Sequence, residues 1–161
     1  MQHAATTVPH KPVKPCRTGR PLKEAIPMLD NWLNLWNGDL ALAGTTVTPD
    51  FVVHAAMLDG SGELHGPQAL ADWIAQLRGA FPDLTFAVQV GPVTDGPMTV
   101  IRWLATGTYA GGFPGASAAP GTAIAFTGID ILRAASEEDG RYAEYWLNSD
   151  MHVLFAQLGL G

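Results

Sequence analysis

The spacing of apolar residues changes near Leu84, and this change constrains the fold more than any other feature of the sequence. Before it, apolar side chains recur at intervals of three and four residues, as on one face of a helix. After it, the period is that of a strand, whose side chains point alternately to opposite faces. Helices followed by long strands, with too little helix between the strands for parallel crossovers, predict an α+β fold with an antiparallel sheet.

Two helices are predicted in the first half of the chain. The first covers residues 24–37, where the apolar face consists of Ile26, Leu29, Trp32, Leu33 and Trp36. Gly38 follows at the position of a left-handed C-cap. The second covers residues 66–81, with Pro67 in its first turn and Pro82 directly after its end. Between the helices we expect a short apolar turn at 39–43, an edge strand over 51–57, a turn at 59–62 and His65 in a loop.

Two long hairpins are predicted in the second half. Residues 84–90 pair with 98–110 across the turn 94–97, and residues 122–134 pair with 140–148 across the turn 136–140. The segment 111–121 is almost wholly Gly, Ala, Ser and Pro, so we expect it to be mobile or lid-like. A last helix over 151–158 can be N-capped by Ser149 or Asp150. Helices cover only one face of such a sheet, and that face becomes a cavity if the sheet curls.

Charge and length divide the chain into two parts. Residues 1–23 hold five of the nine basic residues and no acid. We therefore predict a flexible basic N-terminal arm over 1–21 and one globular domain over 22–161, a length that can bury one proper core. The arm is either a passive tail or a weak binding or targeting segment for an anionic partner.

Composition excludes several classes of protein. Outside residues 1–23, four basic residues face 15 acidic ones, which argues against nucleic-acid binding. No apolar run approaches the roughly 20 residues that cross a bilayer, and no secretory signal is seen, so we expect a soluble, cytoplasmic protein without membrane contact. With Cys16 alone, and with no phosphate loop, serine nucleophile elbow or metal-spaced cluster, we expect action without a cofactor or metal.

Seven motifs occur in the order found in one known family. They are WNGDL (36–40), TPDFVVH (48–54), HGPQAL (65–70), FPDLTF (81–86), RWLATGTYAGGF (102–113), FTGIDILR (126–133) and EYWLNSD (144–150), the last followed by FAQLG (155–159). With these motifs the chain resembles the SnoaL-like polyketide cyclases of the nuclear-transport-factor-2-like superfamily. The resemblance implies a cone-shaped α+β barrel, in which a curved mixed or antiparallel sheet, N-terminal helices and a short C-terminal helix enclose a pocket. It also implies a homodimer that packs the outer faces of its sheets together.

The resemblance further implies a reaction. Characterised cyclases of this kind close a polyketide ring by a cofactor-free intramolecular aldol condensation, with an aspartate as general acid/base. That aspartate aligns with Leu147 here, and a leucine cannot transfer a proton. Asp150 matches the acid of the family's EXWXXXD ending, although an aspartate at the start of a helix is also a common cap.

Asp130 and His54 are the candidate catalytic residues. Asp130 interrupts an apolar strand and shares its side with Phe126, Gly128 and Leu132. The resemblance places this row inside the pocket, where burial favours the neutral carboxyl. His54 lies among apolar neighbours at the pocket entrance of the family and can act as a proton shuttle. The alternatives are a structural hydrogen-bonding role for Asp130 and a packing role for His54.

Aromatic residues are the candidate substrate-binding walls, although helix or strand spacing also explains the tryptophans as core. Tyr145 and Leu147 share one side of the final strand and Trp146 lies on the other, so only one set faces the pocket. Aromatic walls suit flat, hydrophobic ligands. The predicted substrate-binding residues are Trp32, Trp36, Trp103, Phe113, Tyr145, Trp146 and Leu147.

Three functions are compatible with these features. The first is a cofactor-free cyclase, isomerase or lyase acting on a small hydrophobic, polyketide-like carbonyl compound by acid/base catalysis. The second is a non-catalytic ligand-binding or interaction module, which the leucine at position 147 favours. The third is an epoxide hydrolase, which needs a pair of carboxylates around one water molecule.

Overall fold

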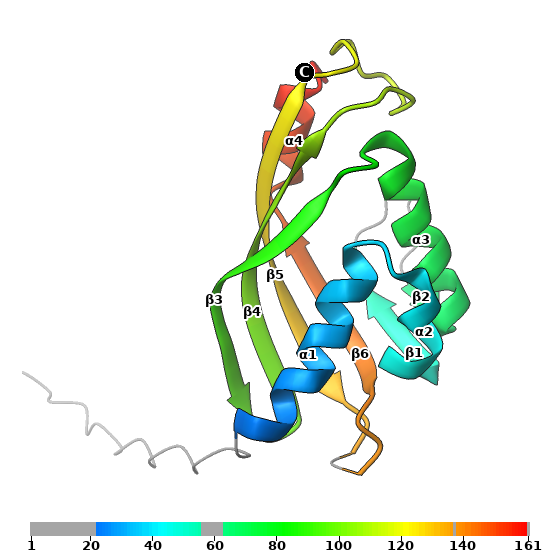
Figure 1. The fold of residues 1–161 in the computed structure, drawn as a ribbon, viewed down its shortest axis with the longest axis vertical. Helices are drawn as coiled ribbons and strands as arrows, with labels where there is room; N and C mark the ends of the chain where they lie inside the picture. The colour runs from blue at the N-terminus through cyan, green and yellow to red at the C-terminus, as the bar shows by residue number, and fades with distance from the viewer. Residues whose placement is uncertain (1–21, 56–62, 137, 161) are drawn as a thin grey trace, which may run out of the picture.

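In the described part of the chain, six strands form one curved sheet in the order β2-β1-β6-β5-β4-β3 (Figure 1). This computed structural model describes residues 22–55, 63–136 and 138–160, with the backbone alone for residues 22–26. The predicted arm 1–21 and the predicted turn 59–62 lie outside the described residues. The strands are β1 (Val47–His54), β2 (Glu63–His65), β3 (Thr85–Asp95), β4 (Met98–Thr108), β5 (Ala123–Ala134) and β6 (Tyr142–Ser149).

Both predicted hairpins are confirmed, as β3–β4 and β5–β6. The sheet is mixed, because β1 pairs in parallel with β6 while the other neighbouring strands pair antiparallel. The chain reaches β6 only after α3 and the strands β3 to β5, and such a long connection permits parallel pairing. His65 is the last residue of β2, so its predicted place in a loop is wrong. The sequence does not reveal this strand, because three residues are too few to show alternation.

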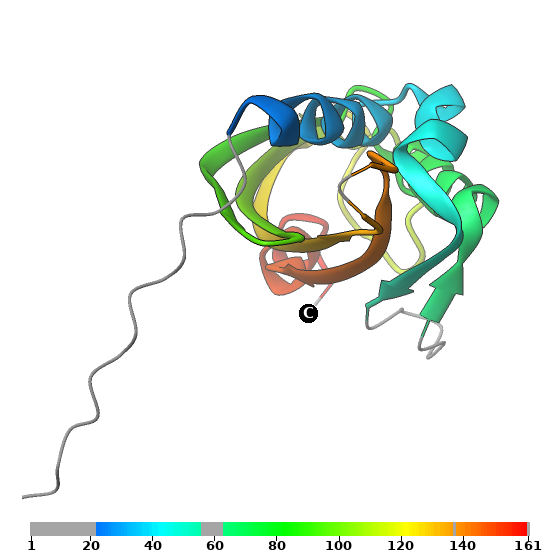
Figure 2. The ribbon, with the colours of Figure 1, turned by 90° about the horizontal axis from the view of Figure 1, so that it is seen from below.

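The helices are α1 (Leu22–Trp36), the 3₁₀ helix η1 (Leu40–Leu42), α2 (Ala43–Thr46), α3 (Gly66–Ala80) and α4 (Met151–Gln157). Figure 2 shows the sheet curving around the interior, with α1 lying across its concave side. The C-terminal end of α1 is fixed to the sheet, because the Asn37 side chain exchanges two hydrogen bonds with the backbone of Phe86 in β3. The two long predicted helices and the predicted C-terminal helix are confirmed as α1, α3 and α4.

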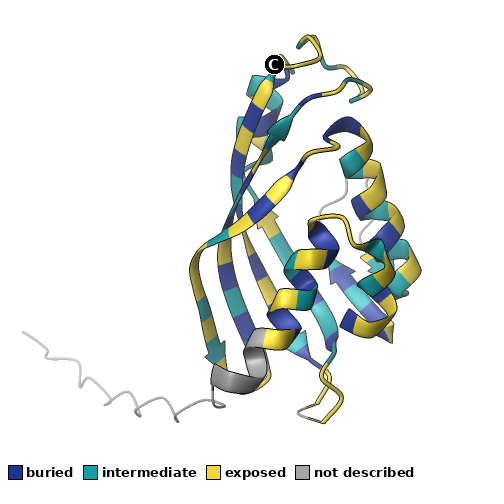
Figure 3. Ribbon diagram, viewed as in Figure 1, coloured by how far each residue is buried: buried dark blue, intermediate teal, exposed yellow. Residues whose placement is uncertain are grey.

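Buried and exposed residues alternate along β5, as Figure 3 shows for the strands of the sheet. Phe126, Asp130 and Leu132 are buried, which places the predicted row on the concave side. In β6 the alternation is interrupted, because Arg133 pairs with Glu144 whereas Ala134 pairs with Tyr142. The skipped residue is a bulge that turns both Tyr142 and Tyr145 into the core.

The segment 111–121 is tied to the C-terminal end of α4. The backbone N–H groups of Ser117 and Ala118 both donate to the carbonyl of Leu158, at 3.0 Å each. The ring of Phe113 packs against those of Phe81 and Phe155. A segment predicted as mobile or lid-like therefore makes specific contacts at this end of the molecule, because small residues let its backbone approach α4 closely.

Candidate functional site

Asp130 lies on the concave side of β5 with its carboxyl group enclosed by three hydrogen-bond donors. Trp32 Nε1 of α1 donates to Oδ2 at 2.9 Å, and Trp103 Nε1 of β4 donates to Oδ1 at 2.7 Å. The Tyr145 hydroxyl of β6 also donates to Oδ1, at 2.8 Å. Only 4% of Asp130 is exposed, and it is the single buried acid among the described residues. One helix and two strands thus meet at this carboxyl.

Burial dominates the electrostatics of this group. Loss of hydration raises the pKa of Asp130 from 3.8 to about 6, although the hydrogen bonds from Trp32, Trp103 and Tyr145 favour the charged form. Burial, together with the charge of Asp130 and the hydrogen bond to it, raises the pKa of Tyr145 well above 10, so this phenol stays a donor. Asp130 consequently changes its charge near neutral pH, as a general acid/base requires.

The two carboxylate oxygens are not equivalent. Oδ1 accepts from both Trp103 and Tyr145, whereas Oδ2 accepts only from Trp32. A carboxylate oxygen has about two acceptor sites. Oδ2 therefore retains the capacity to accept a further proton, and it is the oxygen that faces α1.

Aromatic rings surround the carboxyl. The Trp32 ring meets those of Tyr145 and Tyr142 edge-on, with centroids 4.8 and 5.9 Å away, and that of Trp36 at 5.9 Å. The Phe86 ring in turn packs edge-on against Trp36 and Trp103. The predicted substrate-binding residues Trp32, Trp36, Trp103 and Tyr145 thus form one continuous aromatic cluster around Asp130, which offers apolar walls and a few polar groups.

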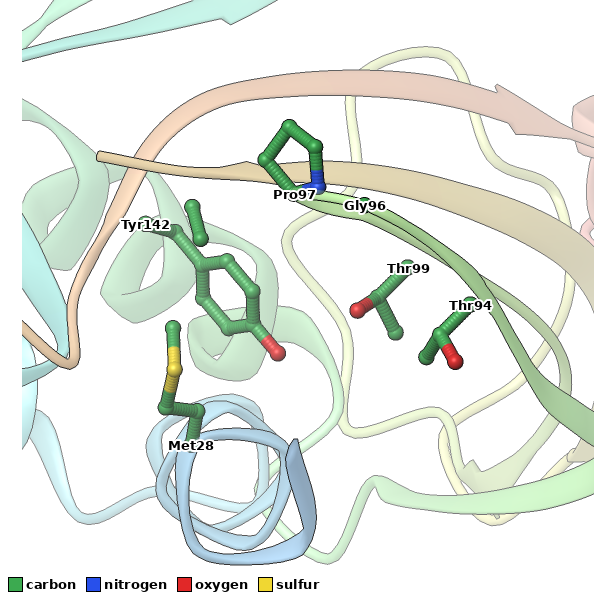
Figure 4. Close-up of a pocket in the computed structure, with 7 residues that line it drawn as sticks. Met28, Thr94, Gly96, Pro97, Thr99 and Tyr142 are labelled. Carbon is green, nitrogen blue, oxygen red and sulfur yellow. The ribbon is translucent and has the colours of Figure 1, made fainter. Parts of the chain in front are cut away.

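A small cavity lies near this cluster, between α1 and the sheet. In Figure 4, Met28 and Tyr142 stand on one side of it, and Thr94 and Thr99 stand on the other. Its volume of about 10 Å³ is at the lower limit for holding one water molecule. Tyr142 connects the cavity to the ring of Trp32 and so to the surroundings of Asp130.

His54 does not converge with Asp130. Phe51 and Val53 of β1 are fully buried, so His54 lies on the opposite face of that strand. Its Nδ1 is 3.2 Å from a carboxylate oxygen of Glu63, and its Nε2 is 3.8 Å from one of Glu144. Its ring stacks on Trp146, with centroids 4.9 Å apart. The structure therefore groups His54 with Trp146 on the convex face of the sheet.

The remaining predicted site residues lie in three places. Leu147 pairs with Asp130 across β5 and β6 and is half-buried against the core, so it shares the inner face with the carboxyl. Phe113 lies in the segment near α4. The Asp150 side chain makes no cap hydrogen bond and instead accepts a short hydrogen bond from the hydroxyl of Thr127. The predicted capping role of that side chain is therefore wrong.

Sequence reasoning missed that the side chains of Trp32, Trp103 and Tyr145 donate hydrogen bonds to the carboxyl group of Asp130. The available signal was that buried indole and phenol groups find an acceptor, and that the sequence offers one acid in an apolar strand. No group of three or more His, Cys, Asp or Glu side chains in the described part of the chain is arranged to hold a metal ion. None of the helices described is long and apolar enough to cross a membrane.

Comparison with solved structures identifies the same architecture in other proteins. IdmH of Streptomyces antibioticus, a proposed polyketide cyclase, is 26% identical with a TM-score of 0.70, over 83% of this chain and 97% of IdmH. A proposed polyketide cyclase of Acidithiobacillus ferrooxidans is 25% identical with a TM-score of 0.73, over 84% and 94% of the two chains. A Catenulispora acidiphila protein of ketosteroid isomerase-like fold is 18% identical with a TM-score of 0.65, over 83% and 93%.

The structure has the ketosteroid isomerase-like fold class, an α+β architecture whose curved sheet here surrounds a buried aspartate. Among the members of this class, one family model accounts for most of the sequence. It matches residues 26–158, and the chain belongs to the SnoaL-like polyketide cyclase family. No curated protein sequence matches the chain closely.

Proposed function

We propose that this protein is a cofactor-free enzyme of the cyclase, isomerase or lyase type that moves a proton on a small hydrophobic, polyketide-like carbonyl compound. Membership of the SnoaL-like family supports a cyclase-type role. The observation that carries the proposal is the buried carboxyl of Asp130, held by two indoles and one phenol. A carboxyl with a pKa of about 6 in an aromatic interior suits proton abstraction next to a carbonyl group.

In the proposed reaction Asp130 acts as the base through Oδ2. The C–H bond next to the substrate carbonyl breaks, and its proton moves to Oδ2. In ring closure, the electron pair of that bond forms a C–C bond to a second carbonyl carbon, whose C=O π electrons move onto its oxygen. This oxygen then receives the proton from Oδ2, which regenerates the carboxylate of Asp130. Trp103 and Tyr145 hold Oδ1 and fix the direction of the carboxyl group throughout.

The surroundings of Asp130 determine which substrates fit. Trp32 covers the carboxyl from α1, so a substrate reaches Oδ2 by displacing this indole or by entering beside it. The aromatic cluster then contacts the faces and edges of the substrate, which favours a flat, largely apolar compound. Leu147 adds an apolar contact on the same inner face as the base.

Hydrogen–deuterium exchange tests the base directly. The probe is 1-tetralone in D₂O, a flat ketone with exchangeable protons next to its carbonyl, followed by NMR. Wild-type protein is expected to accelerate the exchange, and Asp130→Asn to reduce the rate by about a hundredfold or more, the usual contribution of a general base. Asp72→Asn, the same change at an exposed residue, is the matched control and should exchange like wild type. Equal rates for Asp130→Asn and wild type would remove Asp130 from the mechanism.

A ligand-binding module is the second candidate. The leucine at the family's aspartate position and the three donors around Asp130 favour it, since a carboxyl held in this way can be structural. In that case 1-tetralone binds without accelerated exchange. No second buried acid accompanies Asp130 among the described residues, so no observation favours the epoxide hydrolase alternative.

We also propose that the protein is a homodimer that pairs the convex faces of its sheets. A row of apolar side chains crosses this face through register pairs that join Val93 to Val100, Val100 to Ile131 and Ile131 to Trp146. Val93 and Ile131 are exposed, Val93 by 63%. A second copy would bury this row. Without a partner, the exposed apolar side chains would favour non-specific association.

A further inference from the structure

We propose that the indole N–H of Trp36 binds the carbonyl oxygen of the substrate and stabilises the negative charge that forms there when Asp130 takes a proton. The inference rests on the proposed function and assigns a second catalytic residue to the same site. It also defines the ligand class, because an indole N–H can only donate. The ligand must therefore present an oxygen acceptor as well as an apolar surface.

The first observation is a contrast between two equivalent donors. Trp32 and Trp36 lie one turn apart on α1, with ring centroids separated by 5.9 Å. Both residues are buried. Trp32 Nε1 donates to Asp130, whereas Trp36 Nε1 has no hydrogen-bond partner in the described part of the chain. Buried donors are rarely left without an acceptor, and each exception needs a reason.

The second observation is that Trp36 is held in place. Arg78 Nη1 of α3 donates to the backbone carbonyl of Trp36 at 3.3 Å, and the next residue, Asn37, is bonded to the backbone of Phe86. The rings of Trp73 and Phe86 pack edge-on against the indole at 5.3 and 5.4 Å. The indole therefore cannot easily turn toward another acceptor, so its N–H is preorganised for an incoming one.

The third observation is the position of Trp36 beside the base. Its ring centroid lies 6.2 Å from that of Tyr145, and both Tyr145 and Trp32 donate to Asp130. Two of the rings that contact Trp36 are therefore hydrogen-bonded to Asp130. The other two buried polar side-chain atoms without a partner in the described residues are the hydroxyls of Thr46 and Thr48, which can rotate and can both donate and accept. Only the indole N–H combines a fixed direction with a single role.

The test compares 1-tetralone with tetralin, the hydrocarbon that lacks its oxygen. In ¹H–¹⁵N NMR spectra of the full chain, the Trp36 indole signal, assigned in the wild type by triple-resonance experiments, should move downfield with 1-tetralone and not with tetralin. Trp36→Phe keeps an aromatic ring and removes the donor. It should weaken 1-tetralone binding about three- to tenfold, as expected for one hydrogen bond, and leave tetralin binding unchanged. Trp146→Phe, the same change in a ring that stacks on His54 on the convex face, is the matched control and should leave both unchanged.

The same variants separate the two proposals. Trp36→Phe should also lower kcat for α-proton exchange by about a hundredfold, the usual cost of removing one donor to a developing oxyanion. A Trp36 signal that responds to 1-tetralone without Asp130-dependent exchange removes the proposed function and keeps the carbonyl site. Asp130-dependent exchange with an unresponsive Trp36 signal overturns the inference and keeps the function. Binding of neither probe, or an equal response to both, also overturns it.

Discussion

Gly128 and Trp103 face each other across β5 and β4, and the missing side chain of the glycine makes room for the indole. A Cβ atom at residue 128 would lie 2.2 Å from Cζ2 of Trp103 and 2.8 Å from the carbonyl oxygen of Asn148. Neither distance is compatible with ordinary packing. The indole therefore lies across the strand at Gly128, and its Nε1 reaches the carboxyl two residues further along β5.

Gly128→Ala is expected to destabilise the protein, because the new methyl group must displace either the Trp103 ring or the backbone of β6. Overpacking of this kind costs about 1–3 kcal/mol. It should also disturb the hydrogen bond from Trp103 to Asp130. Urea unfolding checks the prediction, with Gly79→Ala in α3 as control. Residue 79 has open space for a Cβ and lies in a helix, so alanine should raise stability there by about 0.5–1 kcal/mol.

Asp130 should make stability depend on pH in an unusual direction for an acid. Burial raises the pKa of Asp130 from 3.8 to about 6, so between these values the folded protein binds more protons than the unfolded chain. The stabilising contribution is present below pH 4 and is lost as the pH rises through about 6. Since a tenfold change in proton affinity corresponds to about 1.4 kcal/mol, the loss is of the order of 3 kcal/mol. Guanidinium unfolding at several pH values measures it.

Asp130→Asn supplies the control for this pH dependence. The amide does not titrate, so the difference in unfolding free energy between wild type and the variant should change between pH 4 and 6.5 and stay constant above. Asparagine also turns an NH₂ group toward at least one of the three donors, which lowers stability at every pH. A difference that is flat across this range would contradict a raised pKa for Asp130.

Tyr145→Phe should cost more at pH 8 than at pH 4.5. The phenol donates to a charged carboxylate at the higher pH, and hydrogen bonds to charged groups contribute about 1.5–3 kcal/mol. At the lower pH the carboxyl is neutral and the bond is weaker. The same substitution in the Asp130→Asn background should show no such dependence, and this double-mutant cycle isolates the pair.

The fold could be predicted to a large extent because local spacing reports element type. The period change near Leu84 separated the long helices from both hairpins, and alternation placed Phe126, Asp130 and Leu132 on one inward row. The parallel partner of β1 could not be predicted, because strand partners depend on contacts distant in sequence. Alternation also left the inward face of β6 open, and the bulge between Tyr142 and Glu144 decides it by turning Tyr145 inward.

The site was predicted as a set of residues and not as a network. Trp32, Trp103 and Tyr145 were expected to line the interior, yet their bonds to Asp130 span 98, 27 and 15 residues of sequence. Such bonds depend on side-chain directions that no local pattern encodes. His54 shows the opposite case: apolar neighbours suggested an inward imidazole, but its place in β1 turns it to the face of Trp146.

His54→Gln distinguishes a proton shuttle from a surface contact. Because the imidazole lies between Glu63 and Glu144 on the convex side, the variant should exchange 1-tetralone protons within about twofold of the wild-type rate. A small loss of stability is expected, of the size of an exposed ion pair, about 0–1 kcal/mol. A rate that falls as far as in Asp130→Asn would instead assign proton transfer to both residues.

The apolar row on the convex face should control assembly. Ile131 lies in the middle of this row, paired with Val100 on one side and Trp146 on the other. In a dimer that pairs convex faces, Ile131→Asp places a charge in the interface without a partner, and an unpaired buried charge is costly. We expect the wild type to sediment as a dimer at micromolar concentration and Ile131→Asp to sediment as a monomer. Gln76→Asp, on the exposed side of α3, is the control and should remain dimeric. A wild-type monomer at that concentration would contradict the proposed dimer, and a dimeric Ile131→Asp would place the interface on another surface.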